Sequence, residues 1–161
     1  MIFRPTQRLC TKIKAGSLSD APLHDNRYAD WSARLFTVNR AQYVLLTNTA
    51  SLFSALMPGR GITEQTVFLG HALQAMRNYM QDDGLSLIFA NFIVPAAGAV
   101  SFHKPLNRSI TGSMNELVAE ATYFLSSDAH SLFDANHKIN EMPHASLRFS
   151  FAREVFKRLG V

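Results

Sequence analysis

The sequence predicts an α+β fold in which an antiparallel sheet of about four or five strands has helices packed on one face. Strand-like segments are concentrated in the first 60 residues, and helical patterns follow them. The turns between three of these segments are too short for a parallel crossover. A chain of 161 residues with 47% hydrophobic residues has the size and composition of one globular unit, so we expect a single domain over residues 1–161.

The first part of the chain contains most of the expected strands. "MIFRPT" alternates as a short strand does, with Pro5 marking an edge or a strand end, and Thr6 precedes a short helix. Residues 15–30 are rich in Gly, Ser, Pro, Asn and Asp and are expected to form a loop. "ARLFTV", "QYVLLT" and "SLFSALM" then have strand composition and are separated by short turns, which predicts an antiparallel meander.

Helical patterns dominate the remainder of the chain. "LSLIFANFI" fits a buried strand or a buried helix, and we favour a short helix, whereas "GAVSFH" is expected to be a strand. The expected helices run from Thr63 to about Gln81, from an S-x-x-E capping box at Ser113 and Glu116 to about Leu125, from about Ser131 to Glu141 before Pro143, and over "SFAREVFKRL".

Composition restricts the compartment and the partners. Cys10 is the single cysteine, which excludes an intramolecular disulfide and favours a reducing cytoplasm. The N-terminal stretch lacks the apolar core of a secretory signal, and the longest apolar run is interrupted by Asn91, Pro95 and Gly98, so we expect no membrane association. A formal charge of +4 is compatible with an anionic partner, but the sixteen Lys and Arg residues are scattered.

The segment "HKPLNRSITGSMNE" is the best candidate for a binding site. Cationic side chains beside a helix N-terminus favour an anion, and glycine allows close approach of a ligand. The predicted anion-binding residues are Lys104, Asn107, Arg108, Ser109, Gly112, Ser113 and Asn115. The structural alternative is that Ser113 and Glu116 only cap the helix while the basic side chains point to water.

Other chemistries have weaker support. His130, Asp134, His137, Glu141 and His144 follow a helical spacing, but this stripe is more simply the wet face of an amphipathic helix, so we predict no metal site and no cofactor.

Catalytic groups are equally sparse. Cys10 is expected to be a buried, inert thiol, and no serine lies in a nucleophile elbow. His103 could act as an acid or base near the anion site, although a lone histidine without a paired acid is more often structural. We therefore assign no catalytic residue.

Three stretches, "MIFRPTQRL", "DWSARLFTVNRAQYVLLTN" and "KPLNRSITGSMNEL", resemble an uncharacterised bacterial family of domains of unknown function. The family pattern K-T-x-N-R-S-x-x-G-S-M-N is matched here by Lys104, Asn107, Arg108, Ser109, Gly112, Ser113, Met114 and Asn115. Pro105 stands where the family has threonine, which removes a hydroxyl from any site there. The resemblance implies a stand-alone cytoplasmic bacterial protein and gives no activity.

The sequence therefore favours a small cytoplasmic binding protein that holds a phosphate of a nucleotide or nucleic acid. An enzyme acting on a phosphate-containing substrate is the first alternative. An antitoxin-like or defence-associated protein that binds a protein partner or a second copy of itself is another.

Overall fold

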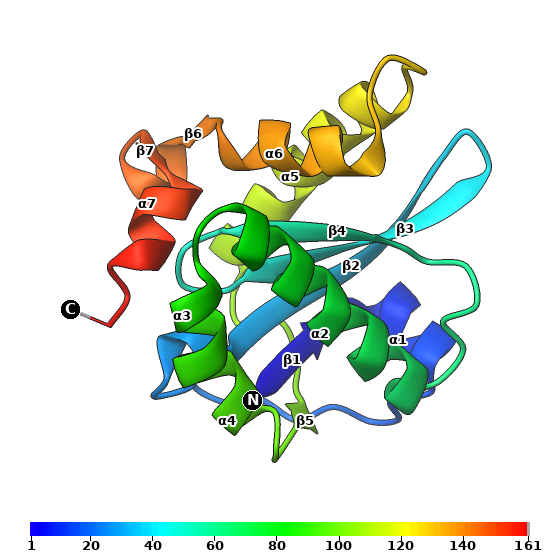
Figure 1. Ribbon diagram of the computed structural model, residues 1–161. Helices are drawn as coiled ribbons and strands as arrows, with labels where there is room; N and C mark the ends of the chain where they lie inside the picture. The colour runs from blue at the N-terminus through cyan, green and yellow to red at the C-terminus, as the bar shows by residue number, and fades with distance from the viewer. Residues whose placement is uncertain (161) are drawn as a thin grey trace.

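The fold is built around a five-stranded sheet with strand order β4-β3-β2-β1-β5 (Figure 1). The computed structural model describes residues 1–160. The strands are β1 (Ile2–Pro5), β2 (Asp30–Val38), β3 (Ala41–Asn48), β4 (Ser54–Pro58) and β5 (Ser101–Phe102). The predicted α+β class is confirmed.

The prediction of a wholly antiparallel sheet is wrong, because β1 runs parallel to both of its neighbours. Ile2 pairs with Asp30 on β2 and with Ser101 on β5. The connection from β1 to β2 contains helix α1 (Gln7–Ile13) and a long loop, which together are long enough for a parallel crossover. Pro5 ends β1 as expected, but the strand is interior and forms no edge of the sheet.

The predicted meander of β2, β3 and β4 is confirmed. Trp31 on β2 pairs with Asn48 on β3, and Leu46 on β3 pairs with Ala55 on β4, in antiparallel register. Asn39 and Arg40 connect β2 to β3 with positive φ angles of 48° and 67°. Two consecutive residues of this conformation make the hairpin turn whose twist matches that of the flanking strands.

Helices cover both faces of the sheet, whereas the sequence predicted one covered face. On the first face, Phe68 and Met76 of α2 (Gln65–Asp82) share a buried cluster with Trp31 and Leu46. Figure 1 shows α2 in front of the sheet, α5 behind it and α6 above the β4 edge.

The second face is covered by α5 (Arg108–Leu125) and α6 (Leu132–Asn140). Leu117 of α5 and Ile139 of α6 form a separate buried cluster with Phe36 and Leu45. Neighbouring strand residues point to opposite faces. Because β2 has apolar residues pointing to each face, it can be buried on both sides of the sheet.

The other segments are short. "LSLIFANFI" is helical, as favoured, and includes a π-helical turn, η2. The remaining elements are η1 (Arg27–Ala29), α3 (Ser86–Ile88), η2 (Phe89–Ile93), α4 (Val94–Ala96), β6 (Pro143–His144), η3 (Ala145–Leu147), β7 (Ser150–Phe151) and α7 (Ala152–Lys157). Within residues 1–160, no helix combines the length and the apolar character needed to cross a membrane.

Two asparagines of α6 cover the free edge of β4. The Asn140 side chain accepts a hydrogen bond from the Ser54 N–H and donates one to the Ser54 carbonyl, both at 2.8 Å. The Asn136 side chain accepts from the Leu56 N–H, also at 2.8 Å. Along β4 the next outward-facing position is Pro58, which has no N–H to donate. The outward N–H groups of this edge are thus satisfied within the chain, which opposes pairing with another strand.

Candidate functional site

The helix that carries the predicted anion site begins earlier than the sequence predicted. α5 starts at Arg108, and Asn107 is its N-cap: its side-chain oxygen accepts a hydrogen bond from the Ile110 N–H at 3.0 Å. The expected capping box at Ser113 and Glu116 is therefore wrong, because both residues lie inside the helix. A capping box does occur at the start of α6, between Ser131 and Asp134.

The seven predicted residues do not all converge on one cavity. Six of them are exposed, and Ser113 is buried, with its hydroxyl 3.2 Å from that of Ser146. Arg108, Gly112 and Asn115 follow one another along the exposed side of α5 at helical spacing. The exposed residues are Lys104, Asn107, Arg108, Ser109, Gly112 and Asn115.

Lys104 differs from the others because it lines a cavity of about 590 Å³. We call this cavity the Lys104 crevice; its lining residues are Pro5, Gln7, Gly16, Ser17, Leu18, Asp20, Lys104 and Pro105. Pro5 ends β1, and Lys104 follows β5, so the crevice lies at the carboxyl ends of two parallel strands. Ligands of open sheets with parallel strands bind at this position.

The polar groups of the Lys104 crevice suit an anion, although the Asp20 carboxylate competes with it for Lys104. The Lys104 ammonium lies 3.7 Å from a carboxylate oxygen of Asp20, and both side chains are exposed, at 54% and 88%. Exposed pairs of this kind contribute little to stability, so an incoming anion can displace Asp20 from Lys104. The amide of Gln7 and the hydroxyl of Ser17 add hydrogen-bond donors to the lining.

A buried ion pair fixes the backbone beside the crevice. The Arg4 guanidinium binds both carboxylate oxygens of Asp30, at 2.8 Å and 2.9 Å. It also donates to the carbonyls of Ala21 and Lys104 through Nη1 and to the carbonyl of Pro22 through Nη2. All five N–H groups of this buried guanidinium are used. Arg4 could not be recognised from the sequence alone, where its only signal was a cation among apolar residues in a short strand.

His103 is held between two hydroxyls outside the Lys104 crevice. Its Nδ1 lies 3.4 Å from Ser19 Oγ, and its Nε2 lies 3.1 Å from Ser101 Oγ. Neither partner is an acid that could orient the ring for proton transfer. Cys10 is buried as expected, and its thiol donates to the carbonyl of Gly16.

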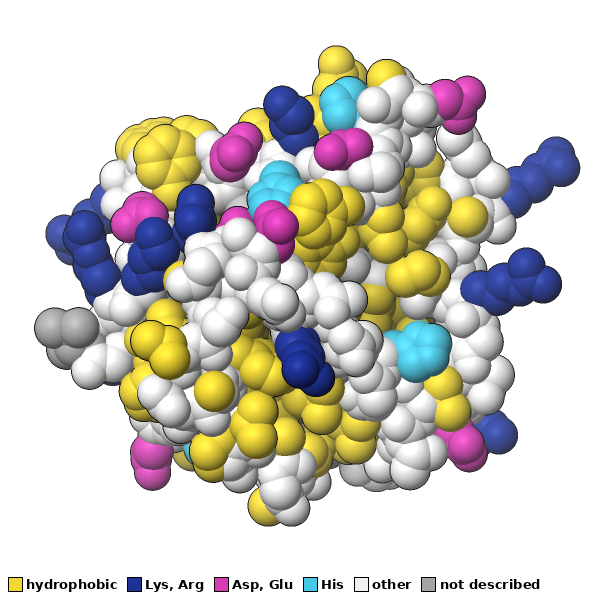
Figure 2. Space-filling model, viewed as in Figure 1, with side chains coloured by type: hydrophobic (Ala, Val, Ile, Leu, Met, Phe, Trp, Pro, Cys, Tyr) yellow, Lys and Arg dark blue, Asp and Glu magenta, His cyan; other side chains and the backbone are white. Residues whose placement is uncertain are grey.

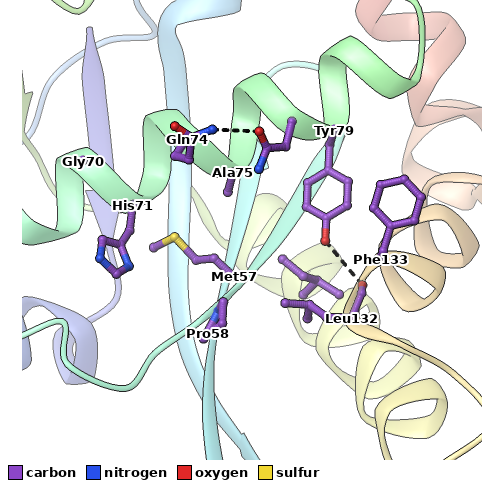
Figure 3. Close-up of a pocket in the computed structure, with 11 residues that line it drawn as sticks. Met57, Pro58, Gly70, His71, Gln74, Ala75, Tyr79, Leu132 and Phe133 are labelled. Carbon is purple, nitrogen blue, oxygen red and sulfur yellow. Dashed lines mark hydrogen bonds between the residues drawn. The ribbon is translucent and has the colours of Figure 1, made fainter.

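A second cavity, of about 500 Å³, lies between α2 and the end of β4 (Figure 3). We call it the α2–β4 groove; its lining residues are Leu56, Met57, Pro58, Gly70, His71, Gln74, Ala75, Asn78, Tyr79, Leu132 and Phe133. The Tyr79 hydroxyl donates to the carbonyl of Leu132 at 3.4 Å, and burial raises the pKa of Tyr79 well above its usual range. The phenol therefore stays neutral at physiological pH. Gln74 donates to Asn78 at 2.7 Å.

The residues of the predicted histidine stripe, from His130 to His144, do not lie together on one exposed surface. Asp134 belongs to the capping box, and His144 lies beyond the helix and is buried. His137 instead faces the end of α2, with Nε2 2.8 Å from an oxygen of Asp82 and Nδ1 3.5 Å from an oxygen of Asp83. No local sequence pattern brings residues 82 and 137 together, so the sequence contains no signal for this contact.

The mixed sheet, helices on both faces and a crevice at the strand ends define a small α+β protein with a pocket of ligand size. The model of the family described as "Domain of unknown function (DUF6933)" matches residues 2–155, so the chain belongs to that family. The predicted membership of an uncharacterised family is confirmed. No curated protein and no solved structure matches the chain.

Proposed function

We propose that this chain is a small binding protein that holds a phosphate-type anion of a nucleotide or nucleic acid. The site is centred on Lys104 in the Lys104 crevice and extends to the first turn of α5. The observation that carries the proposal is a ligand-sized cavity at the carboxyl ends of β1 and β5 with an exposed ammonium at its rim.

The start of α5 supports the same chemistry. Asn107 caps the N–H of Ile110 and leaves the N–H groups of Arg108 and Ser109 at the positions where a helix has no partners of its own. These groups carry partial positive charge, and the Arg108 side chain adds a full charge beside them. Only three residues separate Lys104 from Arg108, so one polyanion could contact both cations.

The enzymatic alternative has less support. It requires a carboxylate or histidine positioned to move a proton in the crevice. Asp20 is paired with Lys104, and His103 is bound to two serine hydroxyls outside the lining. We therefore prefer binding without a chemical step.

Calorimetric titration with inorganic phosphate, ATP and a short single-stranded RNA tests the proposal. Lys104→Ala should weaken binding about tenfold to a hundredfold, the effect of losing one charge-assisted hydrogen bond. Asp20→Asn should tighten binding by up to about fivefold, because it removes the carboxylate that competes for Lys104. Lys138→Ala, which removes an exposed cation from α6, is the matched control and should leave the affinity unchanged.

Three outcomes separate the possibilities. Binding of RNA alone, with an affinity that falls steeply with salt, would identify a polynucleotide as the ligand. Binding of ATP or phosphate would identify a small anion. If none of the three probes binds at low salt, or if Lys138→Ala weakens binding as much as Lys104→Ala does, the proposal is wrong.

A further inference from the structure

A second cluster of chemically active side chains lies where α6 crosses the end of α2. It consists of Asp82 and Asp83 at the C-terminal end of α2 and His137 on α6, and we call it the 82–83–137 cluster. Figure 2 shows histidine and acidic side chains gathered beside hydrophobic ones on this face of the molecule. The cluster borders the α2–β4 groove through Tyr79 and Phe133, whose rings stack on each other, and Phe133 also contacts the His137 ring.

The donor atoms of the cluster have nearly the spacing of metal ligands. One oxygen from each carboxylate and one nitrogen of His137 all lie within 4.8 Å of one another. Nitrogen and oxygen ligands of a first-row metal lie about 2.0–2.2 Å from the ion, so two ligands of one ion are separated by at most about 4.4 Å. Small side-chain rotations would bring all three donors onto one ion.

An independent observation concerns the Asp83 carboxylate, whose side chain is only 10% exposed. The nearest basic side-chain nitrogens are His137 Nδ1 at 3.5 Å and Arg153 Nε at 3.7 Å. Charge-assisted hydrogen bonds are shorter, about 2.7–2.9 Å. The Arg153 Nε is itself buried without a hydrogen-bond partner within the described residues.

This carboxylate is therefore nine-tenths buried and faces the cluster with no close donor. Buried polar groups are normally satisfied at hydrogen-bond distance, so these two longer contacts leave Asp83 room for a closer partner. A dication bound between the three side chains would supply that partner.

We propose that Asp82, Asp83 and His137 form a binding site for a first-row transition-metal dication, for which Zn²⁺ is the probe. An imidazole with two carboxylates suits Zn²⁺, Mn²⁺ or Fe²⁺ better than Ca²⁺, which prefers oxygen ligands alone. Three protein ligands leave positions on the ion for water or for a molecule bound in the α2–β4 groove.

The surroundings of the cluster fit a bound cation. Arg153 Nη2 donates to the Asp83 backbone carbonyl at 2.8 Å and so fixes the end of α2. Its Nε is close enough to hydrogen-bond the second oxygen of Asp83 after a small movement, as outer-shell partners of metal ligands do. The two carboxylates balance the charge of the ion.

Metal titration of tag-free protein tests this proposal. The readouts are calorimetry with Zn²⁺, thermal shift with Zn²⁺, Mn²⁺ and Mg²⁺, and the visible spectrum of added Co²⁺. Wild type should bind one equivalent of Zn²⁺ and show a ligand-field spectrum with Co²⁺. His137→Gln and Asp83→Asn should each weaken binding about a hundredfold or more, since they remove direct ligands and loss of outer-shell partners alone costs tenfold to a hundredfold.

His71→Gln is the matched control, because it removes an exposed histidine of the α2–β4 groove outside the cluster. It should bind Zn²⁺ as wild type does. Melting curves in EDTA show whether each variant folds, and the partly exposed His137 keeps the test available if Asp83→Asn does not fold. Absence of stoichiometric Zn²⁺ binding by wild type, or full binding by His137→Gln, would overturn the proposal and leave a hydrogen-bonded histidine and aspartate pair.

Discussion

Replacing Asp30 with asparagine should destabilise the protein strongly although it changes only one atom type in the side chain. The Asp30 carboxylate is fully buried and accepts from Arg4 Nε at 2.8 Å, from Arg4 Nη2 at 2.9 Å and from the His24 N–H at 3.0 Å. Asparagine offers one oxygen and one NH₂ group, so at least one of these donors would face another donor. The Arg4 charge would also remain buried without its counter-ion.

The expected cost is about 3–5 kcal/mol, the range for breaking one side of a buried ion pair. For a chain of this length that corresponds to a fall in melting temperature of roughly 6–20 °C. Arg4 also holds the carbonyl of Lys104, so the variant should bind phosphate less tightly as well. Urea denaturation followed by circular dichroism measures the first effect and calorimetry the second.

Asp20→Asn is the matched control, since it makes the same chemical change at an exposed pair in the loop before β2 and should cost at most about 1 kcal/mol. The double variant Arg4→Met/Asp30→Asn should be less destabilised than the sum of the two single variants. A loss below about 1 kcal/mol for Asp30→Asn would refute the reasoning, because it would mean that the buried pair contributes no more than a surface pair.

Three further predictions follow from other parts of the fold. Asn140→Ala should lower the free energy of unfolding by about 2–3 kcal/mol in urea denaturation, because it leaves the N–H and carbonyl of Ser54 without partners. Light scattering should show increased self-association through the exposed β4 edge, and unchanged stability would contradict the proposed edge cover. Gly112→Ala and Gly70→Ala should each stabilise the protein by about 0.5–1 kcal/mol, since both lie in long helices where an added Cβ meets nothing within 4 Å, and a lower melting temperature would argue against this. Burial lowers the pKa of His144, so the unfolded chain takes up a proton before the folded protein does, and stability falls as the pH drops below about 6.5. His144→Leu should therefore flatten the pH dependence of the urea midpoint between about pH 7 and pH 5.

Local sequence patterns predicted most of the helices and strands, but they could not predict which distant strands pair with each other. The meander was predictable because short turns permit only antiparallel neighbours. The parallel pairing of β1 was not, since a strand of four residues shows no preference for its partner. The connection through α1 and residues 15–30 was long enough for a parallel crossover, and that length was the available signal.

The start of α5 shows a second limit of prediction from sequence, namely the choice between two possible helix caps. Both Asn107 and Ser113 can cap a helix, and the S-x-x-E pattern favoured Ser113. The structure uses Asn107, and the extra turn adds Ile110, which packs against the buried cluster on the second face of the sheet. Lys104 is the predicted site residue that lines the crevice. The other polar lining residues, Gln7, Ser17 and Asp20, were not predicted, because they come from a helix start and a loop that contain no recognisable motif.

The contacts of Arg4 have a consequence for folding during synthesis. Its partner carbonyl at Lys104 is 100 residues further along the chain, and β1 pairs with β5 in the same region. At about 5–20 residues per second, the ribosome needs roughly 5–20 s to make that stretch. Until then the meander can form, but β1 has one open side and Arg4 lacks one of its acceptors. The strand β1 is therefore completed only after about 100 further residues have been made, and a chain arrested before residue 101 should expose it to chaperones and proteases.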